Sequence, residues 1–185
     1  MMMLPDSRRL GLRVLAKLLA WSGVAVVAYA FLAFVFLPEG DQVVPQLEVD
    51  LSIIAPGEAW FGEWRGQKIV VLHRNEAQLA ALAPDDALYD PASRLSLQPS
   101  EMRNRHRSRE PAWFVAIAHG TDLSCPVRFV PPEEAGDWHG GFIDVCRGSR
   151  YDLAGRVLNG QPAKRNLAVP PYRIEPPQRL WLGAK

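Results

Sequence analysis

The chain has 185 residues, enough for about one domain, and its 21 basic and 20 acidic residues leave a formal net charge of +1. Such a balance gives no strong field for nucleic acid, and no basic stripe with interleaved aromatic residues runs along the sequence. The cluster RNRHRSR at 103–109 is interpreted as a solvated loop, with a surface for an anionic partner as the alternative.

The first predicted element is an uncharged segment of 20 residues at 18–37, LLAWSGVAVVAYAFLAFVFL. As a helix it would extend about 30 Å, the thickness of the hydrocarbon core of a bilayer. A cleaved signal peptide is the alternative, but its apolar region would be about 7–15 residues long and would end in small residues. This segment ends in Phe36, Leu37 and Pro38 instead. The sequence therefore predicts one retained transmembrane helix.

The charges on either side of this segment predict its orientation. Residues 1–17 are expected to form a basic cytoplasmic N-terminus, since positive charge stays on the cytoplasmic side of a membrane. The chain beyond the helix would then lie in the periplasm of a bacterium, anchored to the inner membrane. The stretch SRRLGLR also resembles a twin-arginine export signal, although orientation alone would explain its two arginines. The basic residues before the helix are Arg8, Arg9, Arg13 and Lys17, and the acidic residues after it are Glu39 and Asp41.

After a linker expected at 38–47, where Pro and Gly oppose helix continuation, the sequence changes to short segments of strand type. One soluble helix is expected in NEAQLAALA at 75–83, with Asn75 as its N-cap. Regularly spaced short strands with turns between them predict a mainly β domain at 48–185, an antiparallel sandwich or barrel. The expected strands are LEVDLS, EAWFGEWRG, QKIVVLHR, AWFVAIAH, GGFIDVC, SRYDL, GRVLNG and YRIE.

The chain has only two cysteines, Cys125 and Cys146, and both lie on the expected outer side of the membrane. An oxidising compartment favours a disulfide between them, which would contribute on the order of 3 kcal/mol. Two free buried thiols are the alternative.

No catalytic motif accompanies these features. Gly-x-Ser-x-Gly, a phosphate-binding loop and His-Glu-x-x-His are all absent from the sequence. The adjacent pairs Asp85-Asp86 and Glu133-Glu134 are interpreted as solvated loop charges. We therefore expect no catalytic residues and no independent hydrolase.

Several segments together resemble one known family. The stretch CRGSRYDLAGRVLNGQPAKRNLAVPPYRI at 146–174 resembles the Rieske iron–sulfur subunit of quinol–cytochrome c reductases, of proteobacterial type. Three upstream segments also look like segments of the same family: SREPAWFVAIAHGTDLSC, LYDPASRLSLQP and WRGQKIVVLHRNEAQLAAL. The resemblance implies a Rieske-like domain with a cluster-binding subdomain at about 118–172, a [2Fe–2S] cluster and a place in a respiratory electron-transport complex.

The chain departs from the family at all four positions that the resemblance equates with cluster ligands. The family has Cys and His in a first box, here GTDLSC, where this chain has Gly120 and Asp122. It has Cys and His in a second box, here DVCRGS, where this chain has Asp144 and Arg147. Rieske clusters are held by two Cys and two His, so no ligand of the family pattern remains.

Other residues near the boxes keep the family pattern. Cys125 and Cys146 match the two non-ligand cysteines, which form a disulfide in the family. Ser149 and Tyr151 match positions whose hydroxyl groups tune the cluster, and here we expect them to serve the fold. The stretch GQPAKRNL at 160–167 corresponds to the family's proline loop, which covers the cluster.

The residue types at the four positions are poor ligands for a cluster of this kind. A glycine has no side chain, an arginine offers only donors, and carboxylates are hard ligands, whereas the cluster takes soft thiolates and imidazoles. We expect no cofactor and, in its place, an ion pair between Asp122 and Arg147, which Asp144 joins unless it pairs with another base. The alternative is a metal site that combines His119 and His139 with the two aspartates.

These observations lead to one preferred hypothesis. The chain would be a membrane-anchored, cluster-free Rieske-like subunit with a structural, assembly or accessory role in a respiratory complex. Its partners would be other subunits, of cytochrome b or c type or of an oxidase, and no nucleic acid. One alternative is a functional electron-transfer subunit of quinol–cytochrome c reductase. Another is a thiol–disulfide sensor, although the chain has no Cys-x-x-Cys motif.

Overall fold

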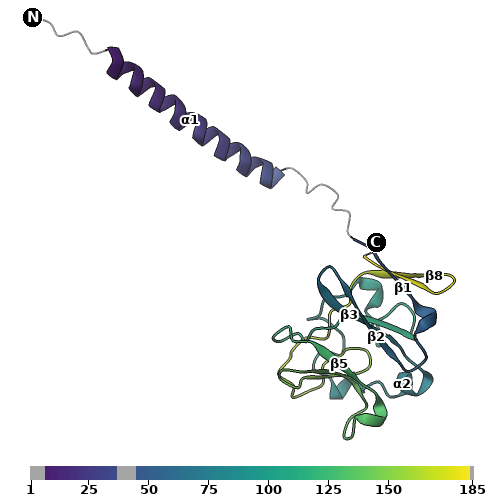
Figure 1. Cartoon of the computed structure of the whole chain (residues 1–185). Coiled ribbons are helices and arrows are strands. Elements are labelled where there is room, and N and C mark those ends of the chain that lie inside the picture. Colours follow the sequence, from purple (N-terminus) through teal and green to yellow (C-terminus); the bar gives the residue numbers. More distant parts are fainter. Residues whose placement is uncertain (1–6, 37–44, 184–185) are drawn as a thin grey trace, which may run out of the picture. The chain divides into compact units, whose positions relative to one another are not determined.

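The computed structural model describes residues 7–36 and 45–183, and the chain divides into two compact units between Val43 and Val44. The first unit contains α1 (Ser7–Phe36), a single uninterrupted helix (Figure 1). Its stretch from Leu10 to Phe36 is long and apolar enough to cross a membrane. The hydroxyl of Ser22 donates to the carbonyl of Leu19 at 2.9 Å, so this polar group is satisfied inside the helix, as an apolar environment requires.

The helix is longer than the predicted membrane segment. It begins at Ser7, so the basic residues Arg13 and Lys17 lie within it. The expected end at Leu37 and most of the expected linker at 38–47 lie outside the described residues.

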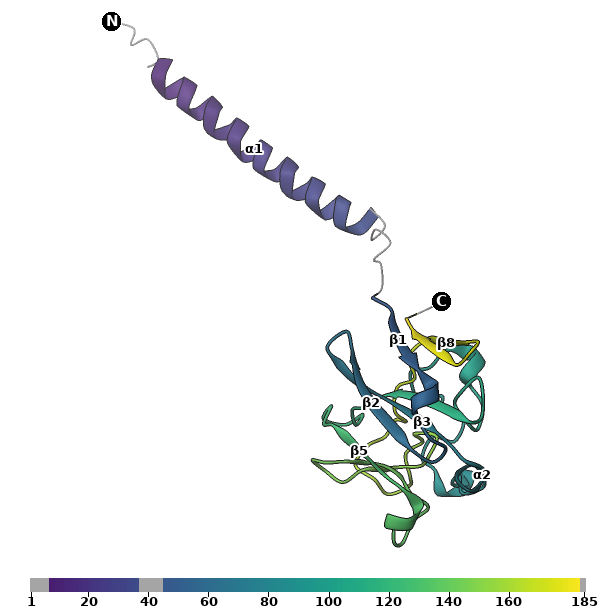
Figure 2. The same ribbon diagram turned by 45° about the vertical axis from the view of Figure 1, so that its right-hand side comes forward.

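The second unit is built from three antiparallel sheets of three strands each, which confirms the mainly β fold class. In both views the sheet of β2, β3 and β4 lies between the other two (Figures 1 and 2). The strand orders are β1-β9-β8, β2-β3-β4 and β5-β6-β7. Their bounds are β1 Leu47–Asp50, β2 Ala59–Trp64, β3 Gln67–His73, β4 Trp113–Ile117, β5 Val127–Val130, β6 Gly141–Asp144, β7 Arg150–Tyr151, β8 Tyr172–Glu175 and β9 Arg179–Leu182.

Two strands were not predicted from the sequence, and one predicted strand is absent. The two strands that were not predicted are β5 and β9, and β9 is the central strand of its sheet. The segment GRVLNG forms turns with two isolated bridges, Tyr151–Val157 and Leu88–Leu158. Long-range pairing, which local sequence patterns do not encode, decides these three cases.

The short helices lie in the connections between strands. α2 (Glu76–Ala80) is shorter than the expected helix at 75–83, but Asn75 caps it as predicted. The Asn75 side chain accepts from the amide of Gln78, whose side chain in turn accepts from the amide of Asn75. The 3-10 helices are η1 Leu51–Ile53, η2 Asp85–Ala87, η3 Ser100–Met102 and η4 Pro132–Glu134.

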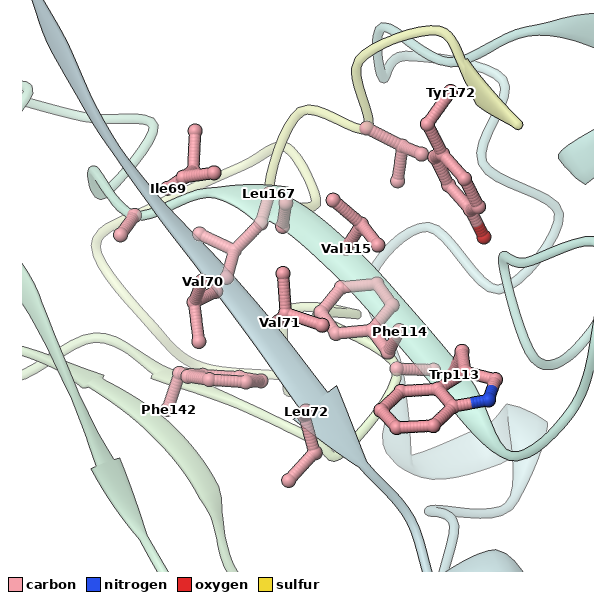
Figure 3. Close-up of a cluster of buried hydrophobic side chains, with 14 of the residues drawn as sticks. Ile69, Val70, Val71, Leu72, Trp113, Phe114, Val115, Phe142, Leu167 and Tyr172 are labelled. Atoms are coloured by element: carbon pink, nitrogen blue, oxygen red, sulfur yellow. The ribbon is translucent and has the colours of Figure 1, made fainter. Parts of the chain in front are cut away.

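The core forms around β3 and β4 (Figure 3). All four consecutive residues from Ile69 to Leu72 are fully buried, so both faces of β3 are covered. Phe114 of β4 contacts Phe142 of β6, with ring centroids 5.8 Å apart, and this joins two of the sheets into one core. Each large apolar side chain buried in this way contributes about 1.5–3 kcal/mol. The core holds β4 and β6 together, and the loops that follow these strands form the site described below.

The interpretation of 103–109 as a solvated loop is wrong for Arg107, which is fully buried. Its guanidinium group donates to the carbonyls of Ala154, Gly155 and Leu167 at 3.2, 3.1 and 2.7 Å. Burial lowers the pKa of Arg107 to about 10, so the group stays charged at neutral pH. Its guanidinium group donates to backbone carbonyls that lie outside the strands. These hydrogen bonds hold the turn after β7 and the end of the proline loop in place.

Candidate functional site

Two neighbouring loops carry the residues that the family pattern singles out. The first box, 120–125, lies between β4 and β5, and the amide of Gly120 donates to the carbonyl of Cys125 at 2.7 Å, which closes the loop. The second box, 144–149, joins β6 to β7, and its ends pair through the amide of Asp144 and the carbonyl of Ser149 at 2.9 Å. A disulfide between Cys125 and Cys146, with Cα atoms 6.0 Å apart, connects the two boxes.

An ion pair spans the boxes at the surface. Nη1 of Arg147 lies 2.8 Å from Oδ2 of Asp122. The Arg147 side chain is half exposed and that of Asp122 is one quarter exposed. An ion pair this exposed contributes about 0–1 kcal/mol, so it orients the two side chains more than it stabilises the fold.

Asp144 does not join this pair, contrary to expectation. Its carboxylate is buried, and Oδ1 accepts from the amides of Cys146 and Arg147 at 2.8 and 3.1 Å. Its other oxygen, Oδ2, has no hydrogen-bond partner among the described residues, and no basic side chain there forms an ion pair with it. Oδ1 therefore stabilises the loop of the second box, whereas Oδ2 is still able to accept a hydrogen bond or bind a cation.

Gly120 and Asp144 share one space. A Cβ atom added at Gly120 would lie 2.1 Å from Oδ2 of Asp144 and 2.9 Å from its Cγ. The carboxylate therefore fills the place that a side chain at Gly120 would need. The structure brings these two ligand-equivalent positions into direct contact.

Ser149 and Tyr151 bond to the protein backbone. Both are fully buried, and Oγ of Ser149 accepts from the amide of Ala163 in the proline loop at 3.1 Å. The Tyr151 hydroxyl accepts from the amide of Thr121 in the first box at 3.0 Å. Burial raises the pKa of the Tyr151 phenol, so it is protonated at neutral pH. These hydroxyl groups tie the first box and the proline loop to β7 and the end of the second box.

Thr121 is a site residue that sequence analysis did not single out. Its hydroxyl donates to the carbonyl of Arg165 at 2.6 Å and so connects the first box to the proline loop. Because the partner lies 44 residues away, no local pattern signals this contact.

The structure does not bring His119 and His139 together in a metal site. His119 lines a pocket of about 430 Å³ beside the first box and the proline loop, whereas His139 lines a separate pocket with Trp138 and Arg150. Among the described residues, the one group of three potential ligands within 4.8 Å of one another is Cys125, Asp144 and Cys146, and it contains neither histidine. The alternative site with two histidines is therefore wrong.

Several known proteins are related to this chain in sequence. The ubiquinol–cytochrome c reductase iron–sulfur subunit of Blastochloris viridis is 34% identical over 182 residues, which cover 96% of this chain and 93% of that protein. The same subunit of Rhodospirillum rubrum is 33% identical over 162 residues, covering 87% and 83%. That of Allochromatium vinosum is 41% identical over 131 residues, covering 68% of this chain and 63% of its relative, which is just under two thirds of the relative's length.

No family model matches the chain. A solved structure entitled "Hyperthermophilic respiratory Complex III" aligns with a TM-score of 0.46 at 18% identity, over 91% of this chain and 98% of that one. The relationship is shown by the sequence relatives, of which one covers almost the full length of both proteins. This chain belongs to the family of Rieske iron–sulfur subunits of ubiquinol–cytochrome c reductase.

Proposed function

We propose that this chain is a Rieske-family subunit that holds no [2Fe–2S] cluster and has a structural, assembly or accessory role in a respiratory electron-transport complex. Its partners are the other subunits of that complex, of cytochrome b or c type or of an oxidase. The names of its relatives, subunits of ubiquinol–cytochrome c reductase, support this class of complex. The proposal that the chain holds no cluster rests on the contact between Asp144 and Gly120.

The residues present do not fit the cluster that the family implies. A cluster of this type takes two thiolates and two imidazoles. The four ligand-equivalent positions offer two carboxylates, a guanidinium group and, at Gly120, no side chain. The guanidinium of Arg147 has no lone pair to donate to iron. The chain's two thiols are joined in the disulfide.

The proposal includes a location and a domain arrangement. Helix α1 is the membrane anchor, the basic segment 1–17 is cytoplasmic, and the domain at 48–185 is periplasmic, after a membrane segment at 18–37 and a linker at 38–47. The charge difference across the uncharged segment 18–37 supports this orientation. The disulfide that joins the two boxes, within the cluster-binding subdomain at about 118–172, supports an oxidising compartment.

The test is a cofactor analysis of the full chain purified from its native membranes. We expect no iron or acid-labile sulfide in proportion to protein and no Rieske signal in a low-temperature electron paramagnetic resonance spectrum. Stoichiometric iron and sulfide with that signal would overturn the proposal.

A restored variant is the matched control. The variant Gly120→Cys, Asp122→His, Asp144→Cys, Arg147→His has the family's ligand set at the four positions. Removing the Asp144 carboxylate opens the space that a side chain at 120 needs. After the same purification, we expect this variant to show the Rieske signal, which establishes that the assay detects a cluster in this scaffold.

The second candidate is a functional iron–sulfur electron-transfer subunit. The names of the relatives and their 33–41% identity favour it. The same spectrum separates the two candidates, since only the second requires a cluster. Copurification of the chain from gently solubilised native membranes then identifies the subunits with which it assembles.

A further inference from the structure

Three potential metal ligands converge between the two boxes. Sγ of Cys125, Sγ of Cys146 and a carboxylate oxygen of Asp144 all lie within 4.8 Å of one another. The two sulfur atoms are bonded to each other in the present state and are therefore not available as thiolates. Reduction of this disulfide would free the two sulfur atoms as thiolates, and the three residues would then be a set of metal ligands.

The third member of the group has the capacity that a ligand needs. The Asp144 carboxylate is 1% exposed, and two backbone amides hold its Oδ1, which fixes its orientation. Its Oδ2 is buried and makes no hydrogen bond to the described residues. A buried carboxylate oxygen without a partner is costly, and a bound cation would relieve that cost.

We propose that reduction of the Cys125–Cys146 disulfide creates a Zn²⁺ site made of the two thiolates and Asp144. A dithiol reductant transfers two electrons and two protons to the sulfur–sulfur bond, gives two cysteine thiols and becomes a disulfide itself. Zn²⁺ then binds the two sulfur atoms and displaces both protons, while the Asp144 carboxylate supplies the third bond and water the fourth.

The geometry suits this ion. Zinc accepts sulfur and oxygen ligands together, at about 2.3 Å and about 2.0–2.2 Å, in a tetrahedral arrangement. Ligand atoms in such a site lie about 3.5–3.8 Å apart. To bind zinc, the two sulfur atoms need only move apart after reduction. The carboxylate oxygen, which lies at most 4.8 Å from each sulfur atom, need only move slightly closer.

The surroundings leave the site accessible and its charge favourable. Cys146 is exposed and Cys125 is half-buried, so both a reductant and a metal ion reach the sulfur atoms from solvent. The charge of Arg147, the basic side chain of the second box, is balanced by Asp122. Two thiolates and one carboxylate carry three negative charges, which leave a net charge of −1 once a Zn²⁺ ion is bound.

This inference goes beyond the proposed function, and the two are tested separately. The proposed function concerns iron in protein from native membranes, whereas this site concerns zinc added to purified, reduced protein. Failure of the zinc site would leave the cluster-free proposal unchanged.

The experiment uses the full chain in detergent micelles, either oxidised or reduced with a phosphine that is then removed without oxygen. Zn²⁺ is titrated in competition with a chromophoric chelator. We expect one Zn²⁺ per chain in the reduced protein and none in the oxidised protein. Co²⁺ in place of Zn²⁺ should give thiolate-to-metal charge-transfer absorption in the reduced protein alone.

Two variants locate the third ligand. Asp144→Asn keeps the shape of the side chain and removes its charge, and we expect it to weaken zinc binding by at least about tenfold. Asp137→Asn is the matched control, since Asp137 is an exposed carboxylate that pairs with Arg150 outside the site, and its zinc affinity should equal that of the unmodified chain.

Proton release tests the proposal without any variant. The reduced, unmodified chain should release close to two protons per bound Zn²⁺ at neutral pH, because both thiols lose their protons. Equal zinc binding by oxidised and reduced protein, equal affinity in folded Asp144→Asn, or binding without proton release would each overturn the proposal.

Discussion

At the scale of single residues, the contact between Gly120 and Asp144 is the feature on which the site depends. Neither residue is unusual by itself, because a glycine in a loop and an aspartate at the end of a strand are both common. Together they fill one space, since a side chain at 120 and the carboxylate at 144 exclude each other. The effect of a substitution at position 120 on stability therefore depends on the residue at position 144, and the reverse also holds.

The variant Gly120→Ala tests this dependence. Its new Cβ would meet the Asp144 carboxylate, and overpacking of this kind costs about 1–3 kcal/mol. In an Asp144→Ala background the same change should cost much less, because the obstructing atoms are gone. Chemical denaturation of the four proteins of this double-mutant cycle measures the coupling. Additive effects would contradict the shared space.

Tyr151 provides a test of pH dependence. Burial raises the pKa of its phenol in the folded protein above the ordinary value of 10.0. The folded state therefore binds the proton more tightly than the unfolded state, and Tyr151 contributes stability below pH 10 that is lost as the pH rises through the raised pKa.

In Tyr151→Phe this alkaline loss should be smaller, whereas stability at neutral pH should fall by about 1–3 kcal/mol because the amide of Thr121 loses its acceptor. Thermal unfolding of both proteins at pH 7 and above pH 10 measures the two effects. A parallel decline of the two proteins at high pH would refute the assignment to Tyr151.

At the scale of elements, buried arginines replace the strand pairing that the segment between β7 and β8 lacks. Arg107 bonds three carbonyls in 154–167, and Arg74 donates to the carbonyls of His106 and Leu153 at 2.9 and 3.3 Å. Both side chains are buried, and burial lowers the pKa of each to about 10. These contacts position the turn after β7 and the proline loop beside the boxes.

The variant Arg107→Met should therefore lower the free energy of unfolding by about 3–5 kcal/mol, the cost of breaking a buried network of this kind. Arg105→Met is the matched control, since Arg105 is exposed in the same stretch, and it should change stability by no more than about 0.5 kcal/mol. Denaturant unfolding followed by tryptophan fluorescence gives both values. Similar values for the two variants would show that burial of Arg107 is not important.

At the scale of the whole molecule, α1 and the β domain are separate units with separate tasks. The helix supplies an apolar surface of a length that suits a bilayer, and the domain supplies its own core. The proposed orientation follows from the charges before and after the uncharged segment 18–37, not from contacts between the units.

The orientation is testable with reporter fusions at the C-terminus. Alkaline phosphatase, which is active only in the periplasm, should be active there, and a fluorescent protein that matures only in the cytoplasm should remain dark. Exchanging Arg13 and Lys17 for Glu should reduce the phosphatase activity, because it weakens the charge difference. An active phosphatase fused before α1 instead would contradict the proposed topology.

The sequence by itself determined the features that depend on local or repeated patterns. The long uncharged segment predicts α1, Asn75 predicts the cap of α2, and the short strand-type segments with turns between them predict the mainly β domain. The residue types at 120, 122, 144 and 147 are read directly from the chain. Each of these depends on side-chain chemistry or on periodicity within a few residues.

Only the tertiary structure decided which residues meet across the chain. It placed β9 at the centre of a sheet, buried Arg107 in a stretch that reads as solvated, and set the Asp144 carboxylate into the space beside Gly120. The physical reason is the same in all three cases. Each outcome is set by burial and contact with residues more than 20 positions away, and no local pattern carries that information.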